Sequence, residues 1–166
     1  TRGLIGWRHM KKHLKLNWQM LMADIDAGEV TSKTGARPKW HLKNLSRLHI
    51  RELDLRPNEI YHAVIIATVN ESREVLEPTV QAVLDSDFDP KKMILVFAYE
   101  GRAGKESEDR VKHLLDLYGD KFLHAMAVKH PPNLKGEIIG KGGNITYAGR
   151  KLHQYLKKTD LDLKRI

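Results

Sequence analysis

The stretch HAVIIATVNESREVLEPTVQAVLDSDFDPKKMILVFAYE, residues 62–100, decides the fold. It holds two short apolar runs, 62–68 and 93–98, separated by apolar residues that recur at helical spacing. Runs rich in β-branched residues with no polar alternation are typical of strands buried on both faces of a parallel sheet. The pattern therefore predicts a strand, a helix and a second strand. Pro78 is expected in the first turn of that helix, where its missing N–H costs little.

The same alternation continues toward the carboxyl end of the chain. Apolar spacing predicts a second helix over 111–118, a weaker third strand over 123–128 and a third helix over 145–156. The residues from Leu161 are expected to begin a fourth strand. Alternating strands and helices predict an α/β fold, a Rossmann-like layered sheet with right-handed crossovers.

Composition excludes several classes of protein. The 166 residues are 41% hydrophobic and 30% charged, so wholesale disorder is not expected. Cysteine is absent, which excludes disulfides, thiolate zinc sites and a cysteine nucleophile. The sequence contains no run of about 18 apolar residues, so it predicts no membrane-spanning helix. The chain starts at Thr1 and ends within an apolar-charged pattern, so we expect it to be a piece of a longer protein.

The net charge of +8 is concentrated near the amino end, which divides the chain into two predicted parts. Residues 1–57 hold twelve Lys/Arg and five Asp/Glu, whereas residues 58–166 hold seventeen and sixteen. Apolar residues recur every three or four positions from Trp7 to Ile25, with lysines alongside, as on one helix. Residues 1–57 are therefore interpreted as a basic helical lead-in, either at a membrane interface or packed on the body over residues 58–166.

Polar residues follow the ends of the first two strands, where ligands of parallel sheets bind. Thr68, Asn70 and Glu71 supply a hydroxyl, an amide and a carboxylate, and a carboxylate there can bind two neighbouring hydroxyls of a ribose. The alternative is a helix-capping cluster. Glu100 ends the second strand and needs a donor, either a nucleobase N–H or a nearby cation such as Arg102.

A glycine-rich segment, Gly136-Glu-Ile-Ile-Gly-Lys-Gly-Gly-Asn144, precedes the third helix. Glycines let a backbone approach phosphate, the start of a helix favours an anion, and Lys141 adds positive charge. The spacing matches neither a Walker A loop nor the dinucleotide-binding glycine motif.

In order and spacing, these motifs resemble the front half of a family-2 glycosyltransferase of the GT-A fold, over roughly residues 61–152. Residues 64–71 resemble the opening strand of that family with its Pro-Thr-x-Asn-Glu motif, although Ala67 and Val69 replace the usual Pro and Tyr. Residues 93–100 resemble the second strand, although Glu100 stands where Asp is commoner. Residues 140–144 resemble the Gly-Lys-x-x-Asn segment. The basic lead-in resembles that of a membrane-associated bacterial branch.

The resemblance implies a nucleotide-binding set, namely Thr68, Asn70, Glu71, Glu100, Lys141 and Asn144. The implied reaction transfers sugar from a nucleoside diphosphate, with UDP-sugar expected, to a glycan or lipid acceptor hydroxyl. It further implies Mg²⁺ or Mn²⁺, location at the cytoplasmic face of the cell membrane and no nucleic-acid partner. The Asp-x-Asp metal motif and the catalytic base are expected beyond Ile166. We therefore assign no catalytic or metal residue here, and we expect the chain alone to bind no metal and to be inactive.

Two alternatives remain open. Residues 138–143 also resemble the signature of the KH RNA-binding domain, whose Gly-x-x-Gly loop, here Gly140–Gly143, clamps a nucleic-acid backbone. Thr146 stands where that pattern needs an apolar residue. The KH resemblance covers only about forty residues and leaves the two strongest predicted strands unexplained. The second alternative is a non-catalytic α/β interaction domain with a basic tail.

Overall fold

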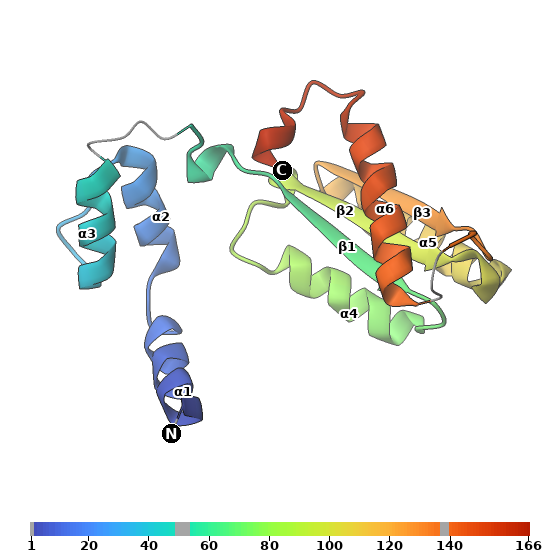
Figure 1. Cartoon of the computed structure of the whole chain (residues 1–166), viewed down its shortest axis with the longest axis horizontal. Coiled ribbons are helices and arrows are strands. Elements are labelled where there is room, and N and C mark those ends of the chain that lie inside the picture. Colours follow the sequence, from blue (N-terminus) through green and yellow to red (C-terminus); the bar gives the residue numbers. More distant parts are fainter. Residues whose placement is uncertain (1, 49–53, 137–139) are drawn as a thin grey trace. The chain divides into compact units, whose positions relative to one another are not determined.

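The computed structural model describes residues 2–48, 54–136 and 140–166 (Figure 1). Contacts between Cα atoms divide the chain into unit 1, Thr1–Ile60, and unit 2, Tyr61–Ile166. Unit 1 contains three α-helices among its described residues: α1 (Arg2–His13), α2 (Trp18–Ala27) and α3 (Lys39–Leu48). Unit 2 alternates β1 (His62–Thr68), α4 (Arg73–Leu84), β2 (Met93–Glu100), α5 (Lys105–Tyr118), β3 (His124–His130) and α6 (Lys141–Leu156).

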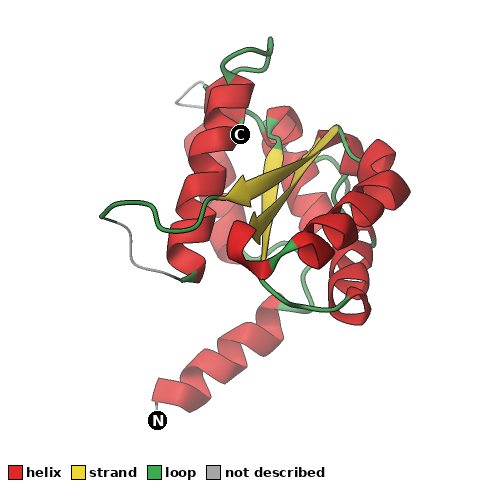
Figure 2. Cartoon of the chain, turned by 90° about the vertical axis from the view of Figure 1, so that its right-hand side faces the viewer, coloured by secondary structure: helices red, strands yellow, loops and turns green. Residues whose placement is uncertain are grey.

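The three strands of unit 2 form a parallel sheet in the order β1-β2-β3. Figure 2 shows this sheet with helices on both of its sides. The predicted α/β architecture is confirmed at this level, and β1 has the predicted bounds. The continuous burial predicted for the first strand is wrong for its amino-terminal half, because His62 and Ala63 are exposed. Every residue of β2 is buried, because it lies between two strands and two helical layers.

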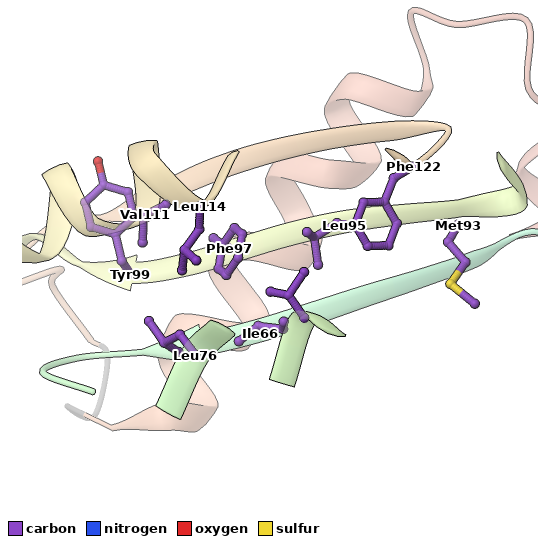
Figure 3. Close-up of a cluster of buried hydrophobic side chains, with 10 residues drawn as sticks. Ile66, Leu76, Met93, Leu95, Phe97, Tyr99, Val111, Leu114 and Phe122 are labelled. Atoms are coloured by element: carbon purple, nitrogen blue, oxygen red, sulfur yellow. The ribbon is translucent and has the colours of Figure 1, made fainter. Parts of the chain in front are cut away.

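Alternate residues of β2 point into two different cores. Leu95, Phe97 and Tyr99 pack with residues of α4 and α5, including Leu76 and Leu114 (Figure 3). The residues between them pack on the opposite face with α6, and this second cluster is Ile94, Val96, Ala98, Val128, Ala148, Leu152 and Leu156. Each core therefore combines every second residue of β2 with residues spaced three or four apart in the helices that pack on that face.

Two predictions about unit 2 are wrong. Pro78 is the sixth residue of α4 rather than part of its first turn, because the helix already begins at Arg73. Because Pro78 has no backbone N–H, the carbonyl of Glu74 lacks its usual hydrogen-bond donor in the helix. The residues after Leu161 form a short 3-10 helix, Leu163–Arg165, instead of a strand. There the side chain of Asp162 accepts a hydrogen bond from the N–H of Lys164 and turns the backbone.

The single helix suggested by the stripe from Trp7 to Ile25 is broken in two. The side chain of Asn17 accepts a hydrogen bond from the N–H of Met20, 3.0 Å away, and so caps a new helix. Gly28, with a φ of 75°, ends that helix.

A buried carboxylate holds the loop between α2 and α3. Asp24 accepts hydrogen bonds from the Nε and Nη2 atoms of Arg37, from the N–H and hydroxyl of Thr31, and pairs with Nε2 of His41 at 3.1 Å. Arg37 above all, together with Thr31, holds the pKa of this carboxyl well below its usual range. Burial of the charge is therefore offset by five polar contacts.

Truncation of Leu114 tests the core of unit 2. The side chain is fully buried between α5 and the sheet, so L114A is expected to lower the free energy of unfolding by about 2–5 kcal/mol. The matched control is L117A on the same helix, where the side chain is 41% exposed and the expected loss is below about 1 kcal/mol. Urea unfolding followed by circular dichroism measures both, and equal losses would contradict this packing.

Candidate functional site

The carboxyl ends of the three parallel strands meet at one edge of the sheet. Thr68 of β1 is paired with Tyr99 of β2, and Glu100 is paired with His130 of β3. The helix α6 contacts all three strands and begins at this edge, because its first residue, Lys141, pairs with Glu71 in the loop that follows β1. We call this edge, with the side chains described below, the strand-end site.

Glu71 lies just beyond β1 and is held by its own loop. Its Oε2 atom accepts a hydrogen bond from the N–H of Val69 at 2.6 Å and another from the hydroxyl of Thr68 at 2.9 Å. Thr68 is fully buried, so its hydroxyl holds Glu71 from the interior of the unit. Oε1 of Glu71 has a looser contact, 3.6 Å from Nζ of Lys141. One carboxylate oxygen is therefore fixed, while the other faces an exposed cation.

These contacts favour the charged form of Glu71. The N–H of Val69 contributes most, followed by its own N–H, the Thr68 hydroxyl and the positive charge of Lys141, and together they lower its pKa to about 2. Partial burial acts in the opposite direction and is outweighed. Glu71 is consequently an ionised acceptor at neutral pH.

The start of α6 lies beside that carboxylate. Lys141 is the first residue of the helix, Gly140 is its N-cap and Gly142 follows in the first turn. A Cβ atom added to Gly140 or Gly142 would meet no atom of a non-neighbouring described residue within 4 Å. The first N–H groups of a helix have no partner within it and carry partial positive charge. An anionic group can therefore approach the backbone and the ammonium of Lys141 together.

Asn144 lies one turn further along α6 and is almost fully buried. Its Nδ2 atom donates to the carbonyl of Ala98 in β2 at 2.9 Å, which fixes the orientation of the amide. Its Oδ1 atom has no hydrogen-bond partner among the described residues. A buried acceptor of this kind favours a ligand that brings an N–H or O–H group.

Glu100 ends β2 on the face covered by α6 and is 3% exposed. Its Oε2 atom lies 3.4 Å from Nε of Arg102 and 3.4 Å from Nδ1 of His130. The ring of His130 in turn packs edge-on against Tyr147 of α6, with centroids 5.2 Å apart. The predicted alternative of a local ion pair with Arg102 is therefore present at Glu100.

The residues predicted to bind a nucleotide differ in their burial and in their contacts. Asn70 is exposed, and Thr68 and Asn144 are buried, whereas Glu71 and Lys141 are in direct contact. Sequence reasoning missed Ser107 of α5, whose hydroxyl donates to the carbonyl of Val69 at 3.0 Å and ties the Glu71 loop to the next helix. The spacing of Ser107 from Val111 and Leu114 was a usable signal, because it puts all three on one helix face.

The strand-end site contains no evident metal-binding group. Within residues 2–48, 54–136 and 140–166, no three His, Asp or Glu side chains are arranged to hold a metal ion. The chain contains four Asp-x-Asp strings, 24–26, 85–87, 87–89 and 160–162. The first belongs to unit 1, the overlapping second and third lie between α4 and β2, and the fourth follows the far end of α6, about 24 Å from its start. None of them is at the edge where Glu71 and Glu100 lie.

Comparisons with protein-family models, with curated proteins and with solved structures find no match to this chain. The glycosyltransferase resemblance therefore remains a prediction from sequence motifs.

The ionisation of Glu71 can be measured by carboxyl-detected NMR. We expect a pKa near 2 in the wild-type chain, and a higher value in T68V, which removes a donor to the charged form. A matched control is T79V, because the Thr79 hydroxyl donates to the carbonyl of Val75 within its own helix. The stabilisation from this ionised carboxylate should be present above pH 4.5, its ordinary pKa, and should be lost as the pH falls toward 2. A wild-type pKa of 4.5 would contradict the described contacts.

Proposed function

We propose that unit 2 binds the nucleotide of a nucleoside-diphosphate sugar, with UDP-sugar as the expected donor, in a GT-A glycosyltransferase of family 2. One observation carries the proposal. The ends of β1 and β2 and the start of α6 bring the ionised Glu71, the buried Glu100 and the cation Lys141 to one edge of a parallel sheet. Open α/β sheets bind ligands at this edge.

The chemistry of the site matches the two ends of a nucleoside diphosphate. Glu71, Glu100 and Oδ1 of Asn144 are acceptors, which suit the hydroxyls of a ribose and the N–H groups of a base. Lys141 and the glycines in the first turn of α6 suit the diphosphate. In this arrangement Thr68 and Ser107 support the loop that carries Glu71 instead of contacting the ligand.

The path of the chain adds support. The helices α4 and α5 pack on one face of the sheet, whereas α6 packs on the other. After α6, the carbonyl of Arg165 accepts a hydrogen bond from the N–H of Tyr61, so the chain returns to the beginning of β1. In open sheets, nucleotides bind in the crevice where the strand order reverses, and a return of the chain toward β1 is the path that such a reversal requires.

In the proposed enzyme, the acceptor hydroxyl attacks the anomeric carbon of the donor as a carboxylate removes its proton, and the bond from that carbon to the diphosphate oxygen breaks so that the nucleoside diphosphate leaves. We assign that proton transfer to no described residue, since Glu71 and Glu100 are used for the nucleotide. The residues of the strand-end site also do not form a set of metal ligands, so no step is assigned to a metal. We expect residues 1–166 to bind nucleotide without turnover. The proposal includes a glycan or lipid acceptor and the cytoplasmic face of the cell membrane.

The RNA-binding alternative is less well supported. Lys141, Gly142 and Gly143 lie within the first turn of α6, not in a loop that could close around a nucleic-acid backbone. The nucleotide proposal also accounts for the parallel sheet that precedes these residues, whereas the RNA-binding alternative does not.

Titration calorimetry of the whole 166-residue chain with UDP tests the proposal. E71Q removes the charge of the acceptor, so we expect about tenfold weaker binding or more. The matched control is E74Q, which removes the same charge from an exposed position three residues away and should leave binding unchanged. A thermal melt of each variant checks that it is folded.

Single-stranded RNA is titrated in parallel. RNA binding that is weakened by K141E, with no binding of UDP by the folded wild-type chain, would replace the nucleotide proposal with the RNA-binding alternative. Binding of neither ligand by a folded chain would contradict both and favour the interaction domain.

A further inference from the structure

Unit 1 has an unusually apolar surface. Of the sixteen large hydrophobic side chains that are exposed among the described residues, ten belong to this unit. They include all three tryptophans of the chain, Trp7, Trp18 and Trp40, each more than 40% exposed. Contiguous exposed apolar surface marks sites of interaction with membranes or proteins.

The interior of unit 1 is too small to account for its helices. Its buried apolar side chains, within the described part of the unit, are Leu21 and Leu45, and the rest of the buried group is the Asp24 network. No residue of α1 is buried, and Gly3 and Gly6 weaken this twelve-residue helix further. An isolated helix of this length is marginal in water, so its formation depends on a surface that covers its apolar side.

The charges of α1 and the turn after it identify that surface. Leu4, Trp7, Met10 and Leu14 follow one side at helical spacing, and Arg8, Lys12 and Lys15 follow the adjacent side. Lys11 lies on the apolar side itself, one turn after Trp7. The ammonium of Lys11 lies 5.0 Å from the ring centre of Trp7, and α1 contains no acidic residue. Protein interfaces are depleted in lysine, whereas tryptophan beside lysine is typical of helices at the surface of anionic lipid bilayers.

We infer that α1 and the exposed tryptophans of unit 1 form a docking surface for a bilayer that contains anionic lipid. The apolar side enters the boundary between head groups and acyl chains, and the lysines pair with lipid phosphates. No helix within the described ranges is long and apolar enough to span a membrane. This inference rests on the membrane location in the proposed function and names the surface that would contact the membrane. The surface belongs to unit 1 and the nucleotide site to unit 2, so a failure to bind vesicles and a failure to bind UDP can be distinguished.

Tryptophan fluorescence provides a direct readout, because every tryptophan of the chain lies in unit 1. The whole chain is titrated with phosphatidylcholine vesicles and with vesicles in which phosphatidylglycerol replaces part of that lipid. We expect a blue shift with the anionic vesicles, a much smaller one with the neutral vesicles, and a loss of the shift at high salt. Absence of a shift with anionic vesicles would overturn the inference, as would an equal shift with both lipids.

Two pairs of variants locate the surface. The double variant K11Q/K12Q should bind anionic vesicles about tenfold to thirtyfold more weakly, whereas K157Q/K158Q in unit 2 makes the same change in charge and should bind normally. M10S should weaken binding about tenfold, whereas L117S on α5 should not. Equal effects within either pair would contradict this surface. Concentration-dependent self-association in the ultracentrifuge without vesicle binding would assign the surface to a second copy of the chain instead.

Discussion

Burial of β2 on all sides is the constraint on which unit 2 depends. Its eight residues are buried between β1 and β3 in the sheet and between the helical layers above and below it. Odd-numbered residues, such as Phe97, fill the core under α4 and α5, and even-numbered residues, such as Val96, fill the core under α6. A change in register by one residue would exchange these two sets, so the two cores fix the strand together.

The same alternation determines the geometry of the strand-end site. Ala98 and Glu100 follow Val96 on the face of α6, so Asn144 reaches the carbonyl of Ala98, and Glu100 meets His130. The packing of Ala148 and Leu152 holds α6 in the position that puts Lys141 beside Glu71. The polar groups at this edge are thus positioned by apolar contacts further along the same strands and helix. Unit 1 differs, since two leucines and one buried ion network form its described interior, whereas ten of its large apolar side chains are exposed.

Much of unit 2 could be predicted from the sequence, because long apolar runs and helical spacing are determined by burial in a layered sheet. The bounds of β1 and the placing of Glu71 and Glu100 at strand ends followed from this. Local polar contacts were harder to predict. The cap at Asn17 and the turn at Asp162 each depend on one side-chain hydrogen bond that apolar periodicity does not register. The pairing of Lys141 with Glu71 joins residues seventy positions apart, so only the folded chain brings them together.

We propose that the edge formed by β1, β2 and the start of α6 is a nucleotide site. Backbone amide NMR of the isotopically labelled chain during titration with UDP tests it most directly. If UDP binds there, we expect shift changes at Val69, at Gly101 directly after Glu100 and at Asn144, and no change in α2 or α3. Shift changes confined to other parts of the folded chain, or none at saturating UDP, would contradict it.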